Sequence, residues 1–502
     1  MNKLETALVF GSHMVLQRGK ELTVWGKGSP GQQVQVKVQD ECQSSMIDDQ
    51  GIWSLILKPL SASEQETMII SSGNESLTYV DVAVGDVWIA GGQSNMEFGM
   101  YSDRNFEQEK EGCKNDNIRF FDYPKVSYDE QLDSLPHNSE GFWRTCDAEN
   151  LTYFSAVGYY FAKEIQAEEQ VPVGVIGCNW GGSTISCWMD KAYSGRGQVW
   201  WDEYEDAVSK LDMEQYEEAI KMDFSAVHND WIDTPYAQFM CQDATFEGLK
   251  AALEMSNVPV LVGPKSPNRP SGLYDTMLKK LVPYQMKGVV WYQGESDDVK
   301  AEVYGELQEG LIKCWRDLWQ EELPFLFVQL PPYEGYGRLS GARFPEIREH
   351  QQWVEDHVPG TAMAVITDTG SRYDIHPKEK HSVGERLALQ ALQKVYKRNI
   401  LGDSPRLTSG RKEDGKIILE FSNVGNGLML EGEQISALEL FQSERLIADY
   451  QFEIAENRIL IEADDIGQDI PVQVQLAYTP YYKVNLYNSE KLPVRPGRIN
   501  IL

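Results

Sequence analysis

The first 85 residues contain short runs in which apolar and polar side chains alternate. Alternation with β-branched residues is typical of strands that bury one face, and the Gly, Pro and Asp residues between the runs indicate turns. The spacing of about 10 to 15 residues between runs is typical of a sandwich, which we predict for residues 1–85. The runs are ELTVWGKG, QQVQVKVQD, GIWSLILKP and ETMIISSG.

From Val84 onwards, continuous apolar strands alternate with amphipathic helices. Strands of this kind are covered on both faces, which indicates an α/β fold with a parallel sheet flanked by helices over residues 86–400. A charged, aromatic stretch at about 196–255 interrupts the pattern and predicts a helical insertion that forms a lid or wall. The strands include DVWIA, VPVGVIGCNW, MKGVVWYQ, LPFLFVQL and TAMAVITD, and the helices include SAVGYYFAKEIQAEEQ and SVGERLALQALQKVYK.

The helical pattern ends near residue 400, and GKIILEFSNVG, RILIEAD and VQVQLAY again predict strands. We therefore expect a second all-β domain over residues 401–502. A chain of 502 residues is long enough for about three domains, which agrees with this division.

Charge and composition exclude several classes of protein. The chain has 46 Lys and Arg against 77 Asp and Glu, a net charge of −31, so it repels phosphate backbones and we expect no nucleic-acid partner. No run approaches the roughly 20 apolar residues of a membrane span, and MNKLETALVF lacks the apolar centre of a signal peptide. Seven scattered cysteines without a CxxC indicate free thiols. We expect a cytoplasmic protein without a membrane partner.

Glycines and hydrogen-bonding side chains follow the predicted parallel strands. GGQSN follows the first, GGS the second and QGESD the third, and Asp368 and DIHP follow a later strand. Ligands of α/β sheets bind where the carboxyl ends of parallel strands gather. We therefore expect these segments to form one site.

Ser94, His376 and a nearby carboxylate have the chemistry that acyl transfer requires. The reaction needs an activated hydroxyl, a base held by a carboxylate, and donors for the oxyanion. Ser94 can supply the hydroxyl and His376 the base, with Asp374 or Asp368 orienting the imidazole. The order Ser, Asp, His is one that such triads use. The plainer alternative is that Ser94 and His376 only end a strand or cap a helix.

Three groups are candidates for the oxyanion hole: the N–H of Ser94, the N–H of Gly182 and the side-chain amide of Gln293. Gly181 can replace Gly182, and Gln293 can instead be a turn amide that bonds the local backbone. Neither HExxH nor a G-x-G-x-x-G or Walker motif is present, so we expect no metal and no cofactor. Gln93, Asn95 and Glu295 are predicted to bind substrate. Glu295 and Asp297 can either bind substrate or only brace their loop.

Four blocks resemble the sialate O-acetylesterase family of SGNH hydrolases: GGQSNM, WGGSTISCW, KGVVWYQGESD and DIHPKEKHSVGERLA. HMVLQR, LPFLFVQLPPY and NLYNSEKLPVRPGR extend the resemblance nearly end to end, except over about 196–255. The resemblance implies an SGNH-type catalytic domain with Ser94 as nucleophile, His376 as base, and Gly182 and Gln293 among the oxyanion donors. The family generally shows a D-x-x-H spacing whereas this chain reads D-I-H, so Asp374 is our first choice and Asp368 the second.

The resemblance further implies a serine esterase that removes O-acetyl groups from sialic acid, with an O-acetylated sugar as its partner. The residues by themselves support only acyl transfer, so an esterase acting on acetylated xylan or another acetylated glycan is an alternative. A non-catalytic carbohydrate-binding protein is a third, given 13 Trp, 24 Tyr and 17 Phe. Sialic acid has a carboxylate that xylan lacks, so an arginine in the site would favour the first; the candidates are Arg104, Arg269, Arg343 and Arg348.

Overall fold

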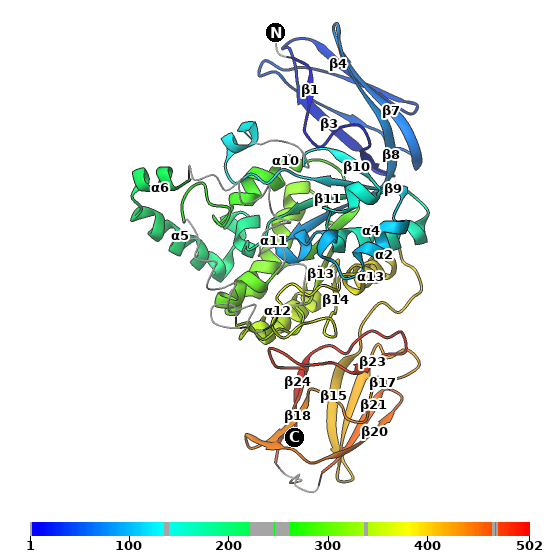
Figure 1. Cartoon of the computed structure of the whole chain (residues 1–502), viewed down its shortest axis with the longest axis vertical. Coiled ribbons are helices and arrows are strands. Elements are labelled where there is room, and N and C mark those ends of the chain that lie inside the picture. Colours follow the sequence, from blue (N-terminus) through cyan, green and yellow to red (C-terminus); the bar gives the residue numbers. More distant parts are fainter. Residues whose placement is uncertain are drawn as a thin grey trace. The chain divides into compact units, whose positions relative to one another are not determined.

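The computed structural model describes residues 3–134, 140–220, 245, 262–335, 340–463, 467 and 470–502. The chain divides into two compact units. The first comprises Met1–Ala237, Val258–Ser296 and Glu306–Phe325, and the second comprises Gln238–Asn257, Asp297–Gly305 and Leu326–Leu502. Both units contain helices and strands (Figure 1), so the prediction of an α/β chain with β regions at its two ends is confirmed.

The N-terminal strands each bury one face. Along β4 (Gln33–Val38), Val34, Val36 and Val38 are buried and the residues between them are exposed, which is the period of a half-buried strand. Two antiparallel groups result, as predicted for this region. The first is β1 (Glu5–Thr6), β3 (Leu22–Lys27) and β6 (Ile52–Leu57), and the second is β5 (Glu41–Met46), β4 and β7 (Ser63–Ser72).

The long strand β8 (Glu75–Gly92) connects these strands to the parallel sheet of the first unit. Its first half pairs antiparallel with β7, and its second half lies between β11 (Val173–Asn179) and β12 (Gly288–Tyr292), parallel to both. Residues 82–92 are buried throughout, because both faces of a parallel sheet are covered. The order is β10-β9-β11-β8-β12, with β9 (Asn115–Asp122) parallel to β11, β10 (Trp143–Cys146) antiparallel to β9, and β2 (Val15–Gln17) beside β8.

Helix α4 (Ala156–Glu169) covers part of this sheet. It begins where the Ser155 hydroxyl accepts from the N–H of Gly158 and ends at Gln170, whose backbone is left-handed. Its Phe161 meets Trp88 of β8 edge to face, with ring centroids 5.0 Å apart. The other helices of this part are α1 (Ser94–Glu97), α2 (Phe106–Gly112), α3 (Ala148–Leu151), α10 (Lys279–Leu281) and α11 (Tyr304–Trp319).

The predicted insertion begins with helices. After the short 3-10 turns η3 (Ile185–Trp188), η4 (Lys191–Tyr193) and η5 (Gly195–Gln198), the chain forms α5 (Val199–Ser209) and α6 (Met213–Ile220). The rest of the stretch, apart from Thr245, lies outside the described residues, and the predicted domain boundaries stay predictions. Among the helices that the structure describes, none combines the length and the apolar character needed to span a bilayer.

The second unit contains a smaller α/β part and a C-terminal β region. In the former, β13 (Phe325–Val328) neighbours β14 (Thr361–Ala364), and the helices are α12 (Phe344–His357) and α13 (His381–Gln390), which continues as the π-helical turn η9 (Ala391–Val395). The β region has sheets β15-β16-β21-β20, β19-β18-β22-β24 and β17-β23. Their bounds are β15 (Arg406–Glu413), β16 (Lys416–Ser422), β17 (Met429–Leu430), β18 (Leu438–Gln442), β19 (Arg445–Ile447), β20 (Gln451–Ala455), β21 (Arg458–Glu462), β22 (Val472–Leu476), β23 (Leu486–Tyr487) and β24 (Gly497–Ile501).

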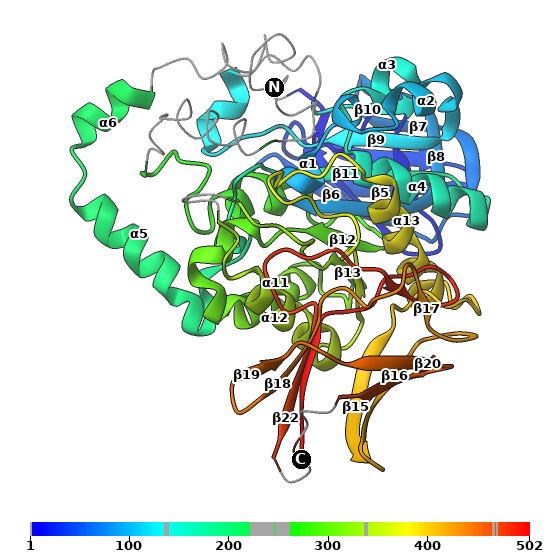
Figure 2. The same cartoon turned by 60° about the horizontal axis from the view of Figure 1, so that its bottom comes forward.

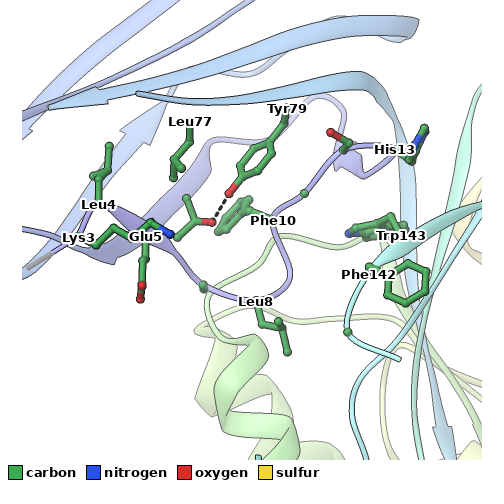
Figure 3. A pocket seen from close by; sticks show the side chains of 15 residues that line it. Lys3, Leu4, Glu5, Leu8, Phe10, His13, Leu77, Tyr79, Phe142 and Trp143 are labelled. Carbon is green, nitrogen blue, oxygen red and sulfur yellow. Dashed lines mark hydrogen bonds between the residues drawn. The ribbon is translucent and has the colours of Figure 1, made fainter. Parts of the chain in front are cut away.

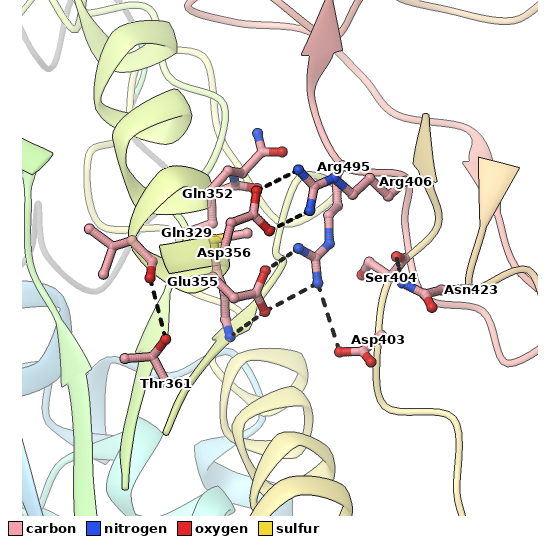
Figure 4. Close-up of polar contacts among 12 residues, drawn as sticks. Gln329, Gln352, Glu355, Asp356, Thr361, Asp403, Ser404, Arg406, Asn423 and Arg495 are labelled. Carbon is pink, nitrogen blue, oxygen red and sulfur yellow. Dashed lines mark hydrogen bonds and ion pairs between the residues drawn. The ribbon is translucent and has the colours of Figure 1, made fainter. Parts of the chain in front are cut away.

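Apolar packing and ion pairs hold the second unit together. Leu419, Leu440 and Ile459 are fully buried in the core of the C-terminal strands, and each contributes roughly 1.5–3 kcal/mol by leaving water. Figure 4 shows two arginines of this region meeting carboxylates of α12. Arg495, 3% exposed, pairs with Glu355. Arg406 pairs bidentately with Asp356, at 2.5 and 2.6 Å, and the planar fork of such pairs adds geometric specificity.

Candidate functional site

Three parallel strands end side by side at Gly92. In the register of the sheet, Gly92 lies opposite Asn179, the last residue of β11, and Tyr292, the last residue of β12. The segments that follow these strands therefore leave from one edge of the sheet, as predicted. Gly92 has a φ of +136°, and a Cβ here would lie 2.1 Å from the carbonyl oxygen of Tyr292. Only glycine fits at this position.

Ser94 is the first residue of α1 and follows the end of β8 by two residues. Figure 2 labels both elements. It is partly exposed, whereas Asn95 and Met96 are fully buried. The N–H groups of Met96 and Glu97 both donate to the carbonyl oxygen of Gln93 at 2.9 Å, which closes the turn that presents Ser94. A partly exposed hydroxyl on a tight turn after a buried strand suits a nucleophile.

Gly182 lies in a turn directly after β11. The N–H of Ser183 donates to the carbonyl oxygen of Trp180 at 3.3 Å, and Gly182, with a φ of +75°, is the third residue of that turn, where glycine is favoured. Gly182 is exposed, and nothing lies within 4 Å of a Cβ built on it. The N–H of Gly181 instead donates to Glu97. Within this turn, Gly182 is therefore better placed than Gly181 to donate to a bound oxyanion.

Glu97 is a residue of the site that the sequence interpretation missed. It lies three residues after Ser94 on the short helix α1, so the two side chains share a face. A Cβ on Gly181 would lie 3.4 Å from the Cβ of Ser94 and 3.2 Å from a carboxylate oxygen of Glu97. Its spacing of three residues from Ser94 could have indicated that Glu97 belongs to the site. Its partner could not be predicted, because a main-chain N–H has no signature in the sequence.

Gln93 and Gln293 bond each other. The carboxamide oxygen of Gln93 accepts from the N–H groups of Gly294 and Ser296 at 3.3 and 3.2 Å, so it is an acceptor. The amide nitrogen of Gln293 donates to that oxygen at 3.1 Å and to the carbonyl oxygen of Ser183 at 3.2 Å. Because these bonds use both amide hydrogens, they favour the alternative in which the fully buried Gln293 braces the loops.

Two further polar contacts join the same segments. The side-chain amide of Asn95 donates to the carboxylate of Glu295, and both residues are buried. Ser183, also buried, donates its hydroxyl to the carbonyl oxygen of Trp180 at 2.7 Å and accepts from the indole of Trp188 at 2.9 Å. The structure therefore brings together all predicted site residues that belong to the first unit.

His376 lies in the second unit, between β14 and α13. It is 9% exposed. Burial, together with the positive charges of Lys378 and Lys380, lowers the pKa of His376 well below its ordinary value of 6.5. The imidazole is therefore neutral at neutral pH, which is the form that a general base must have before the reaction.

Both candidate aspartates have other partners nearby. Asp374 accepts from the main-chain N–H of His376 at 3.0 Å and pairs with Lys378 at 2.9 Å, while Lys378 also donates to the carbonyl oxygen of His376 at 3.1 Å. Asp368 forms a bidentate pair with Arg386 of α13, at 2.5 and 2.8 Å. Asp374 thus holds the main chain of His376, whereas Asp368 anchors the following helix. These contacts favour Asp374 as the carboxylate that positions the base.

A cavity of about 480 Å³ lies among the N-terminal strands (Figure 3). Tyr79 and Thr6, whose hydroxyl oxygens are 2.7 Å apart, form part of its wall, with Phe142 and Trp143. None of its lining residues is a predicted site residue, so we do not assign the chemistry to it. In the part of the chain that the structure describes, no three His, Cys, Asp or Glu side chains gather as a metal site requires.

Comparisons with known proteins find a family model, several relatives and a solved structure to which this chain is similar. A family model described as "Carbohydrate esterase, sialic acid-specific acetylesterase" matches residues 84–264 and 258–393. The chain is 28% identical to the sialate O-acetylesterase of Mus musculus over 429 residues, 77% of this chain and 72% of the relative. It is 25% identical to the sialate O-acetylesterase of Homo sapiens over 437 residues, 80% of this chain and 72% of the relative.

The fold is similar to that of a solved enzyme. The crystal structure of a carbohydrate acetylesterase from Xanthomonas citri superposes with a TM-score of 0.76 and 27% sequence identity, covering 99% of both chains. Together with the family match, this similarity supports carbohydrate esterase activity for the present chain.

We predict that Gln293→Ala lowers the free energy of unfolding by about 1–3 kcal/mol, because it removes the donor from two buried acceptors. Urea denaturation followed by circular dichroism measures the change. Gln293→Glu should be at least as destabilising, since a carboxylate cannot donate to either acceptor. As a control, Gln33→Ala on the exposed face of β4 should stay within about 0.5 kcal/mol of the parent. Parental stability with ester hydrolysis slowed about 10²–10³-fold would instead show direct donation to the oxyanion.

Proposed function

Because the chain belongs to the family of carbohydrate esterases described as sialic acid-specific acetylesterases, we propose that it hydrolyses O-acetyl esters of sialic acid with Ser94 as nucleophile. The residues matched by the family model include Ser94, Gly182, Asp374 and His376. The observation that carries the proposal is the position of Ser94, partly exposed at the end of β8 and next to the turn that contains Gly182.

In the proposed reaction, the Ser94 hydroxyl attacks the carbonyl carbon of the acetyl group while His376 takes its proton. The N–H groups of Ser94 and Gly182 donate to the oxyanion that forms. Collapse of the tetrahedral intermediate releases the sugar hydroxyl, which takes the proton from His376, and leaves the acetyl group on Ser94. Water then attacks this acetyl ester while His376 takes its proton, the bond to Ser94 breaks, Ser94 receives that proton from His376, and acetate leaves.

Asp374 supports the base in this proposal. Its contacts with the main-chain N–H of His376 and with Lys378 fix the backbone from which the imidazole projects. Its negative charge also offsets that of Lys378 when His376 becomes a cation. An aspartate two residues before the histidine can act in this way, although the usual spacing in the family is three.

Binding the carboxylate of sialic acid requires a positively charged side chain. Of the candidates, Arg343 pairs with two glutamates and the fully buried Arg348 donates to two carbonyl oxygens. Arg269 belongs to a loop that packs against the segment after the Gly182 turn, where the N–H of Ser271 donates to the carbonyl oxygen of Ser186 at 2.8 Å. Its nearest approach to Asp275 is 3.9 Å, a weak pairing. Arg269 is therefore our choice for binding the carboxylate.

Ser94→Ala should reduce hydrolysis of p-nitrophenyl acetate by several orders of magnitude while the fold is retained, because only the chemistry needs the hydroxyl. Initial rates and circular dichroism spectra check both parts. Ser183→Ala is the matched control: it removes a buried structural hydroxyl and should lower stability more than turnover. Near-parental turnover by Ser94→Ala would show that another residue is the nucleophile. A parent protein without any esterase activity would favour a carbohydrate-binding protein.

The pH dependence of kcat/KM should report the lowered pKa of His376. Since protonation of the free base abolishes activity, the acid limb of the profile should have its midpoint below 6.5. Lys380→Met removes one of the positive charges that lower this pKa, so the midpoint should move upwards, towards 6.5. Rates of ester hydrolysis between about pH 4 and 8 measure the shift. A midpoint above 6.5 in the parent, or a downward shift in the variant, would contradict this assignment.

Substrate preference tests the choice of sialic acid and of Arg269. With acetate release as the readout, the parent should prefer O-acetylated sialic acids to acetylated xylo-oligosaccharides. Arg269→Met should lower kcat/KM for the former by at least about tenfold, the cost of a charge-assisted hydrogen bond, and leave the latter unchanged. Arg196→Met, on an exposed arginine paired with Glu306, serves as the control. A parent that prefers xylo-oligosaccharides would make an acetylxylan esterase the better assignment.

A further inference from the structure

Glu97 joins the helix of the nucleophile to the turn of the oxyanion hole. It is the last residue of α1, and Ser94 is the first. One oxygen of its carboxylate accepts from the N–H of Gly181, the residue before Gly182. The Cα of Gly181 packs so closely that a Cβ would lie 3.2 Å from this oxygen and 3.4 Å from the Cβ of Ser94. The carboxylate thus links the helix that carries Ser94 to the turn that carries Gly182. The proposed reaction depends on the distance between the Ser94 hydroxyl and the N–H of Gly182.

The hydrogen bond from Gly181 to Glu97 also determines which N–H group of the turn is left to donate to an oxyanion. A turn of four residues has two central N–H groups, and the third N–H closes it by donating back to the first carbonyl. Here Ser183 closes the turn and Gly181 donates to Glu97, so Gly182 carries the remaining central N–H. Rotation of the peptide group that carries the Gly181 N–H would also move the N–H of Gly182. The contact with Glu97 opposes that rotation.

A half-buried cation holds the carboxylate in place. The ammonium of Lys125 lies 3.5 Å from the second oxygen of Glu97 and 3.2 Å from a carboxylate oxygen of Glu140. Burial acts to lower the pKa of Lys125, but the carboxylates of Glu97, Glu140 and Asp122 raise it above its ordinary value, so the ammonium stays charged. Glu140 further accepts from the main-chain N–H of Lys125 at 3.0 Å. Glu97 is therefore fixed at both oxygens.

From these contacts we infer that Glu97 is a positioning residue for the oxyanion hole, acting through the N–H of Gly181 on that of Gly182. The inference rests on the proposed function, because it assigns a role in the reaction of Ser94. Loss of a complete oxyanion donor slows acyl transfer about 10²–10³-fold. A donor that remains but is misplaced should cost less, roughly 10- to 100-fold.

Kinetics of the full-length chain with p-nitrophenyl acetate test this role. Glu97→Ala should lower kcat by roughly 10- to 100-fold with KM changed less than about twofold, because the ester binds before the oxyanion forms. Glu97→Gln keeps an oxygen that can accept from Gly181 and should recover kcat to within about threefold of the parent. Glu97→Asp keeps the charge but is one methylene shorter, so its kcat should be as low as that of the alanine variant. It also provides the test if the alanine variant does not fold.

Glu140→Gln is the matched control, since Glu140 contacts the same lysine without touching Gly181. Its kcat should stay within about twofold of the parent even if urea denaturation shows lower stability. The role of Glu97 is wrong if Glu97→Ala keeps kcat within twofold, if the glutamine variant is as impaired as alanine, or if Glu140→Gln slows the reaction equally. Dependence of the parent on Ser94 separates this failure from that of the proposed serine mechanism, which fails if Ser94→Ala remains active or the parent is inactive.

Discussion

The close approach of β8 to the carbonyl group of Tyr292 governs the site of the first unit. At this point three parallel strands end in register, and the space between Gly92 and Tyr292 leaves no room for a Cβ. The N–H of Gln93 then donates to Tyr292 at 3.0 Å, so the chain stays attached to β12 for one residue beyond the strand. The hydroxyl of Ser94 can be presented where it is because the backbone before it is held on both sides.

Burial separates the bracing groups from those that take part in the proposed reaction. Gln93, Gln293 and Ser183 have little or no exposure, and they bond each other or nearby main-chain groups. An unmet donor or acceptor inside the protein costs about 1–3 kcal/mol, so such a network has few alternative arrangements. Ser94 and Gly182 retain access to solvent beside it. A rigid, internally satisfied frame around two accessible groups is what preorganised catalysis of acyl transfer requires.

The sequence was sufficient to predict the fold class and the segments that meet, because apolar strands ending in glycines and polar residues must gather at one edge of a parallel sheet. It was insufficient to predict the partners of each side chain. A glutamine at position 293 is compatible with a side-chain amide that donates to an oxyanion and with one that donates to Gln93. The register of β8 and β12 decides which of these partners it meets. The pairing of Asp368 with Arg386 likewise depends on how α13 returns along the preceding loop. Contacts of this kind follow from three-dimensional packing and leave no local pattern.

Two positive charges act on His376, although the net charge of the whole chain is −31. His376 is buried with Lys378 and Lys380, and their positive charges favour the neutral imidazole that accepts a proton. The same charges oppose the imidazolium that forms when Ser94 attacks. In the proposed mechanism, the pairing of Asp374 with Lys378 at 2.9 Å reduces that opposition without direct protonation of the aspartate. In this proposal, Asp374 acts on His376 through Lys378, whereas the carboxylate of a triad usually contacts the imidazole ring itself. Such a role suits an aspartate only two residues before the histidine.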